Sequence, residues 1–211
     1  MKALAVVFSA LFLFSCQSAY YSTMEQFGVE KRDILVDNVE DAKESQEDAQ
    51  QQFSSALDQF IQLTNYDGGE LQDVYENLKD QFEASQDSAE RVSDRIDKVE
   101  TVADDLFEEW QEELKKYSSE KLRRDSQIKL KDTQRRYKSL LKAMRKAEST
   151  MAPVLSAMQD NVLYLKHNLN ASAVSGLQGE LDNIKKDINQ LIKEMNSAIK
   201  QSNVFITSMK N

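Results

Sequence analysis

Apolar residues recur every seven positions along much of the chain, in the pattern that packs one stripe of a helix against other helices. After the turn NYDGGE, one such series runs from Leu71 to Leu106 and a second from Tyr75 to Tyr117. Twelve of the thirteen positions in the two series are apolar, which predicts a single long helix over residues 70–118. The same spacing predicts three further helices, over residues 32–64, 122–168 and 173–208.

Few residues in the chain interrupt these helices. The sequence holds one proline and five glycines in 211 residues, and short turns near Gly68 and Ala171 bring consecutive helices back on themselves. Aromatic residues such as Phe82 and Trp110 are large for a two-stranded seam. We therefore predict an all-α fold, an elongated antiparallel bundle of about four long helices with coiled-coil-like heptad packing. Pro153 should kink or split the third helix, because its ring removes a backbone donor and collides with the preceding turn.

The formal net charge of −9 is divided unevenly along the chain. Residues 17–120 carry 28 acids and 9 bases, a net of −19, whereas residues 121–211 carry 8 acids and 17 bases, a net of +9. An acidic cluster around Trp110 precedes a predicted turn, and a basic run over residues 121–146 follows it, so a hairpin would lay them side by side. Exposed ion pairs contribute only about 0 to 1 kcal/mol, so charge would choose the register more than supply stability. Anionic lipid or glycan is the alternative partner for the basic run, and nucleic acid is not expected for an exported chain.

The first residues have the pattern of an export signal. Lys2 is the only charge before Cys16, and the fourteen residues from Ala3 to Cys16 are mostly apolar. This run is shorter than the roughly 20 residues that a membrane-spanning helix needs. We therefore predict a signal peptide over residues 1–15.

The end of this run, LFSC, resembles a bacterial lipobox, in which a peptidase cuts before a cysteine that carries a diacylglycerol. Phe14 departs from the small or β-branched residue usual at that position, and an ordinary cleavable signal is the alternative. The resemblance implies a lipid on Cys16 and, because Gln17 follows it, sorting to the outer membrane. The expected organisation is a lipid-anchored tether over residues 16–31 and a helical bundle domain over residues 32–211.

Candidates for chemistry are few. His167 is the only histidine and stands near a predicted helix end, where its charge can cap the helix. A carboxylate metal site in a bundle needs Glu-x-x-His pairs, but Tyr164 stands three residues before His167. The sequence shows no glycine-rich phosphate loop, no cysteine cluster and no nucleophile beside a histidine. We expect no enzyme activity, no metal and no cofactor.

Methionines at heptad spacing leave two interpretations open. Met144, Met151 and Met158 form a stripe that is best explained as a core seam, although methionines also line adaptable binding grooves.

Residues 24–57, the following YDGGEL and the later LKHNLNA resemble an uncharacterised family of small helical bacterial lipoproteins, known only as a domain of unknown function. The resemblance covers nearly all of the chain after the signal. It implies a Gram-negative envelope protein of long helices, without an activity to carry over.

Within this region, GVEKRDILVD places charges before apolar residues close to the tether. One interpretation is a helix start packed on the bundle, and the other is a partner-docking patch made of Lys31, Arg32, Asp33, Ile34 and Leu35.

Together these features favour a non-enzymatic, lipid-anchored scaffold, spacer or adaptor on the periplasmic side of the outer membrane. It would hold the membrane through Cys16 and a protein partner, or a second copy, through its helices. The alternative is a carrier that binds an apolar ligand or a client peptide between its helices, suggested by the methionine stripe and the alanine- and serine-rich first helix.

Overall fold

The computed structural model describes residues 30–64, 71–168 and 171–210, and every regular element in these ranges is an α-helix. The prediction of an all-α fold is therefore confirmed. In chain order the helices are α3 (Lys31–Thr64), α4 (Leu71–Leu114), α5 (Glu120–Ser149), α6 (Met151–His167) and α7 (Ala171–Lys210).

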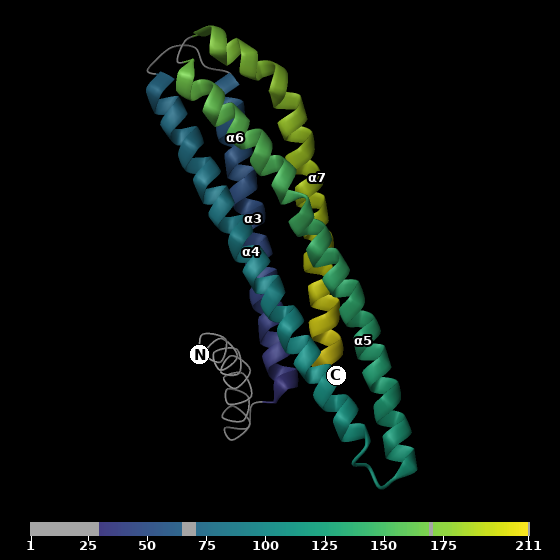
Figure 1. Cartoon of the computed structure of the whole chain (residues 1–211). Helices are drawn as coiled ribbons and strands as arrows, with labels where there is room; N and C mark the ends of the chain where they lie inside the picture. Colours follow the sequence, from purple (N-terminus) through teal and green to yellow (C-terminus); the bar gives the residue numbers. More distant parts are fainter. Residues whose placement is uncertain (1–29, 65–70, 169–170, 211) are drawn as a thin grey trace, which may run out of the picture.

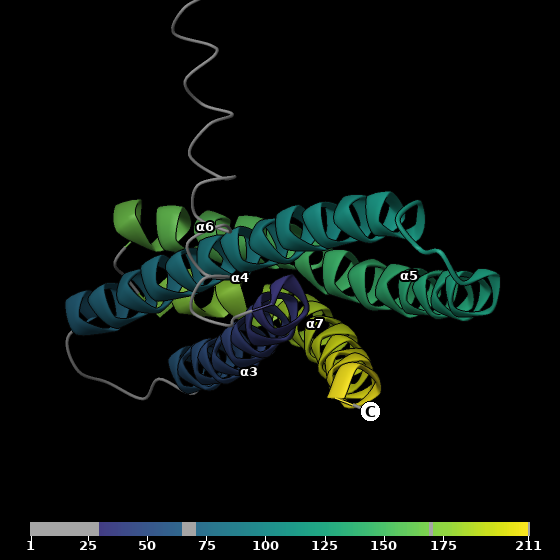
Figure 2. The ribbon, with the colours of Figure 1, turned by 90° about the horizontal axis from the view of Figure 1, so that it is seen from below.

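The helices form one elongated bundle in which consecutive long helices run in opposite directions (Figure 1). α3 packs against α4 and α7, and α5 packs against the same two helices. α6 continues the direction of α5 and also contacts α4 and α7. Seen from below in Figure 2, α3 and α7 lie on one side of the bundle and α4 and α5 on the other. The predicted antiparallel bundle of about four long helices is thus confirmed, with α5 and α6 together in the place of the third.

The heptad positions form the core. Val92, Ile96, Val99 and Ala103 of α4 are fully buried, as are Leu191, Met195 and Ala198 of α7. Because burial of each large apolar side chain contributes about 1.5 to 3 kcal/mol, these seams hold the helices together.

The predicted heptad series is wrong at its last position. Tyr117 lies beyond the end of α4 at Leu114, and 42% of its surface is exposed. The N–H groups of Lys115 and Lys116 donate to Glu112 and Glu113 carbonyls and close the last turn. α5 then begins at Glu120, and the residue before it, Ser119, caps the helix by accepting a hydrogen bond on its hydroxyl from the N–H of Leu122.

Pro153 divides the predicted third helix, as expected. α5 ends at Ser149, the N–H of Thr150 donates to the carbonyl of Ala147, and α6 begins at Met151. Pro153 thereby stands in the first turn of α6, where a missing N–H costs no hydrogen bond within the helix.

Three aromatic rings join three helices near the middle of α5. Tyr137 of α5 packs edge-on against Phe107 of α4, with ring centres 5.4 Å apart, and against Phe205 of α7, at 6.4 Å. One turn further along α4, the indole Nε1 of Trp110 donates to the hydroxyl of Ser126, at 2.8 Å. These contacts fix the register of α5 against both neighbours.

Candidate functional site

The expected docking residues form the first turn of α3, but their apolar half is not a surface. Leu35 is fully buried and only 6% of Ile34 is exposed, because the start of α3 packs on the rest of the bundle. Lys31 Nζ lies 3.0 Å from a carboxylate oxygen of Glu109 in α4, which ties the helix start down further. Arg32 and Asp33 are exposed. A patch that includes Ile34 and Leu35 is therefore wrong as an exposed docking surface, and the alternative of a packed helix start is the one observed.

Cys16 and the predicted signal peptide lie outside the described residues. Among the helices that the structure does describe, none is both long and apolar enough to cross a membrane.

The residues considered for chemistry occupy ordinary structural positions. His167 is exposed and is the last residue of α6. In the acidic cluster, Glu109 pairs with Lys31 and Trp110 bonds to Ser126. No group of three or more histidine, cysteine, aspartate or glutamate side chains within residues 30–64, 71–168 and 171–210 is arranged to hold a metal ion.

The methionine stripe belongs to the core. Met144 is fully buried, and Met151 and Met158 are each 2% exposed. The core interpretation of this stripe is confirmed, and the stripe lines none of the grooves described below.

The acidic and basic segments lie side by side across the α4–α5 hairpin, as the charge pattern predicts. Asp104 and Glu108 of α4 line a shallow groove together with Lys138 of α5. Tyr137 also lines this groove, where burial first and the charge of Asp104 second raise the pKa of its phenol to about 12. Further along, the guanidinium of Arg145 reaches from α5 to two carboxylates of α4, Asp97 and Glu100.

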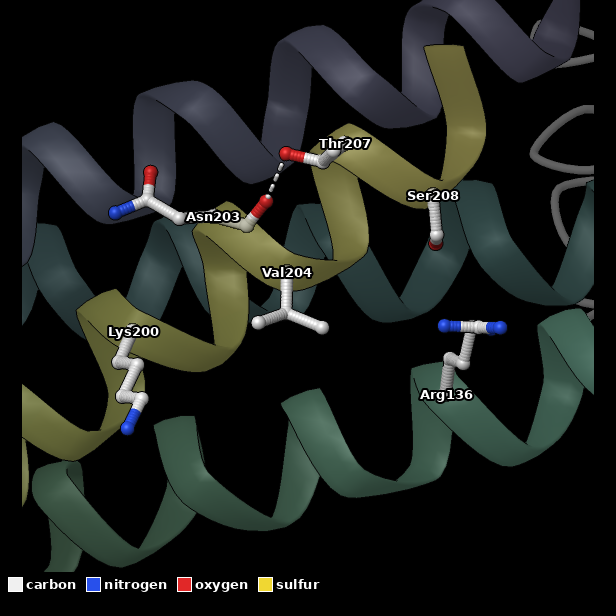
Figure 3. Close-up of a pocket in the computed structure, with 6 residues that line it drawn as sticks. All are labelled: Arg136, Lys200, Asn203, Val204, Thr207 and Ser208. Carbon is white, nitrogen blue, oxygen red and sulfur yellow. Dashed lines mark hydrogen bonds between the residues drawn. The ribbon is translucent and has the colours of Figure 1, made fainter. Parts of the chain in front are cut away.

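One surface hollow lies between α5 and α7, and we call it the α5–α7 groove (Figure 3). Its volume is about 600 Å³, and its lining residues are Arg136, Lys200, Asn203, Val204, Thr207 and Ser208. Figure 3 shows the Arg136 and Lys200 side chains on either side of Val204, which is 47% exposed. Two cations that flank an apolar side chain suit an anionic group with a short apolar portion.

The two hydroxyls of this groove are engaged within α7. Thr207 donates to the carbonyl of Asn203 at 2.8 Å, and Ser208 donates to that of Phe205 at 2.7 Å. Direct recognition would therefore fall to Arg136, Lys200 and the Asn203 amide. The sequence signal for this groove is weak, because Lys200, Val204 and Ser208 share one helix face by spacing, whereas Arg136 joins them only through the register of α5.

A second hollow, of about 530 Å³, lies between α6 and α7. Its character is acidic, since Asp160 and Glu180 line it together with Tyr164 and Asn161. A Cβ at Gly176 would lie only 3.0 Å from the hydroxyl of Tyr164, so glycine allows the two helices to approach closely here.

Comparison with known proteins identifies the family to which the chain belongs. Residues 20–209 match the model of DUF2959, a protein family of unknown function. The chain belongs to the DUF2959 family. The match begins after the predicted signal and extends into the last turn of α7, so the resemblance to a domain-of-unknown-function family is confirmed over nearly all of the bundle. No curated protein and no solved structure matches the chain.

Proposed function

We propose that this DUF2959 protein is a non-enzymatic, lipid-anchored spacer, adaptor or scaffold on the periplasmic face of a bacterial outer membrane. The observation that carries the proposal is a lipobox-like LFSC sequence followed by a single elongated bundle. α4 alone has 44 residues, a length of about 66 Å at 1.5 Å per residue. A tether that enters at the start of α3 would hold one end of this rod close to the membrane.

The far end of the rod would then be presented away from that surface. In Figure 1 the end of α6 and the start of α7 lie at the end of the bundle opposite the end of α4 and the start of α5. The α6–α7 hollow, with Asp160 and Glu180, lies towards that far end. A partner bound there would be held tens of ångströms from the anchor, which is what a spacer or adaptor does.

The anchor is tested by metabolic labelling with a palmitate analogue in bacteria that produce the full chain with a C-terminal tag. The expected result is a labelled protein in the outer-membrane fraction, with no label on a Cys16→Ser variant. Ser15→Ala is the matched control, because it keeps a small residue before the cysteine and should keep the label. An unlabelled parent protein would refute lipid anchoring.

The adaptor role is tested by crosslinking in the same cells, followed by mass spectrometry of the proteins that co-purify. Envelope proteins that are captured reproducibly and lost in the Cys16→Ser strain would support an anchored adaptor. Crosslinks between copies of the chain alone would refute an adaptor and favour a scaffold built by self-association.

A carrier of an apolar ligand or client peptide is our second candidate, and the α5–α7 groove is what now supports it. Its exposed apolar side chain is Val204, and Arg136 and Lys200 flank that side chain. A fluorescent dye for exposed apolar surface should bind the folded chain, and Val204→Lys should remove the part of the signal that comes from the α5–α7 groove. Leu163→Lys, at an exposed position of α6, is the control. Absence of dye binding by the parent chain would refute the carrier.

A further inference from the structure

The α4–α5 hairpin extends beyond the other helices of the bundle (Figure 1). The start of α3 is level with Glu109 of α4, as the ion pair with Lys31 shows. α7 ends five residues after Phe205, which packs on Tyr137 of α5. The first 12 or so residues of α5 therefore lie past the end of α7, an overhang of about 18 Å. We call residues 115–131 the hairpin tip.

The hairpin tip is strongly basic although the whole chain is acidic. It holds seven bases and two acids, a net of +5, against −9 for the chain. Arg123 and Arg124 share the carboxylate of Glu120. Lys121, Lys129 and Lys131 form no ion pair with any residue in the part of the chain that the structure describes. Pairing within the bundle thus leaves most of this positive charge exposed.

The same tip exposes large apolar side chains. Tyr117 is 42%, Leu122 56% and Ile128 60% exposed, and all three lie within twelve residues. A single exposed apolar residue is ordinary, but three among lysines and arginines are typical of segments that rest in a membrane interface. In that setting the bases contact lipid phosphates while the apolar side chains enter the headgroup region. A partner that offers only phosphate groups would leave Tyr117, Leu122 and Ile128 in water.

The hairpin tip lies close enough to the start of α3 to reach the membrane to which Cys16 would be attached. Fourteen residues separate Cys16 from Lys31, and such a length of chain spans at most about 50 Å. Lys31 and the hairpin tip lie at the same end of the bundle. A lipid on Cys16 therefore leaves the tip within reach of the bilayer.

We propose that residues 115–131 dock on the anionic phospholipid surface of the membrane that carries the anchor. The lysines and arginines hold the headgroup phosphates, and Tyr117 and Leu122, nearest the apex, enter the interface. The biological setting of this inference rests on the proposed anchoring, but residues 115–131 should bind anionic lipid even without a lipid on Cys16. Two contacts at one end would orient the rod relative to the membrane, whereas the lipid on Cys16 alone would attach it at a single point.

The test uses the chain from residue 17 onward, which contains all the described helices, in sedimentation with phospholipid vesicles. We expect binding to phosphatidylcholine vesicles that contain phosphatidylglycerol, little binding to pure phosphatidylcholine, and weaker binding as NaCl is added. A triple variant with Lys121→Gln, Lys129→Gln and Lys131→Gln should lower the partition coefficient about a hundredfold, since each base near an anionic surface contributes a factor of about five.

The matched control removes three exposed lysines of α7, through Lys185→Gln, Lys186→Gln and Lys193→Gln. This control has the same net charge as the hairpin variant and should keep its binding within a few-fold of the parent chain. A second variant, Tyr117→Gln with Leu122→Gln, should lose the part of the binding that survives high salt. Far-UV circular dichroism checks that each variant is folded, as expected for substitutions at exposed positions.

Equal binding to neutral and anionic vesicles, or equal losses in the two lysine triples, would overturn the proposal. So would the absence of binding by the parent chain. Failure of the anchor is recognised separately, because palmitate labelling of Cys16 in cells does not depend on the hairpin. A labelled protein that ignores anionic vesicles refutes the docking surface alone, and an unlabelled protein that binds them refutes the anchor alone.

Discussion

Gln46 in the middle of α3 offers the sharpest test of the packing. Its side chain is fully buried, and neither its amide oxygen nor its amide nitrogen has a hydrogen-bond partner among the described residues. Ala42, Ala49 and Phe53, one or two turns away on the same face, are also fully buried. Each buried polar group without a partner costs about 1 to 3 kcal/mol relative to its hydrated state. Gln46→Met, which keeps the length and the helix propensity, should therefore stabilise the protein by about 2 kcal/mol.

Urea unfolding of the chain from residue 17, followed by circular dichroism at the helical band, measures this change. For a protein of this size, about 2 kcal/mol should also raise Tm by about 4 to 8 °C. Gln51→Met is the matched control, because Gln51 is exposed on the same helix and its replacement should change stability by less than about 0.5 kcal/mol. A destabilised Gln46→Met variant would refute the reasoning, since it would mean that the amide is hydrogen-bonded in solution.

Three further predictions concern the contacts between helices. Burial raises the pKa of Tyr137 from its ordinary 10.0 to about 12, so the folded state favours the neutral phenol. The free energy of unfolding, measured by urea titration, should therefore fall as the pH rises from 10 to 12. In a Tyr137→Phe variant the part of this decrease that is due to Tyr137 should be absent. Phe205→Ala should cost about 3 to 5 kcal/mol in the same assay, because the ring is only 1% exposed, and a loss below about 1 kcal/mol would contradict its place in the core. Arg145→Met should cost about 1 kcal/mol, because it breaks the partly exposed pairs with Asp97 and Glu100, and the loss should shrink as NaCl is added.

The heptad pattern was sufficient to predict the helices because a helix has a fixed period. Residues such as Val92 and Val99 return to the same face whatever partner covers them, so their burial follows once any bundle forms. Pro153 was equally informative, since the loss of an N–H is a local property of the chain. In both cases the physical cause lies within a few residues of the position predicted.

Tyr117 was predicted wrongly for the opposite reason. Its heptad position is correct, but the cap formed by Ser119 starts a new helix, and α4 has already ended at Leu114. Whether a residue at a helix end is covered depends on how far the neighbouring helices reach, and no spacing within one helix contains that information. The same dependence hid the α5–α7 groove, because Arg136 approaches Lys200 only through the register of two helices.

The docking patch expected at the start of α3 shows how a local pattern can be ambiguous. Three apolar residues after a charged run are compatible with a helix start packed on a bundle and with an exposed patch. The structure decides between them through distant residues, because Glu109 of α4 fixes Lys31 and the core covers Leu35.

Buried polar residues contribute little to the choice of register. Ser85, Asn161 and Ser202 donate to carbonyls four residues earlier in their own helices, so these bonds do not require any particular neighbour. Contacts that do cross between helices include the Tyr137 ring pairs, the hydrogen bonds of Trp110 to Ser126 and of Gln52 to Gln81, and ion pairs such as Arg145 with Asp97. α4 carries fifteen acids and α5 eleven bases, so opposite charge favours their pairing. Charge does not decide every pair, because α4 also packs on α3, which is itself acidic with eight acids and three bases.

This use of charge has a consequence at the surface. One face of α5 meets the acids of α4, but a helix with eleven bases cannot direct all of them to one neighbour, and those of its first turns extend beyond the bundle. The excess positive charge is therefore concentrated at the end where the chain from Cys16 enters α3. Under the proposed function, the positive charge that favours the pairing of α5 with α4 also determines which end of the rod faces an anionic membrane. Lys121, Lys129 and Lys131 separate these two effects, because removing them should leave the stability of the bundle unchanged while it weakens the contact with lipid.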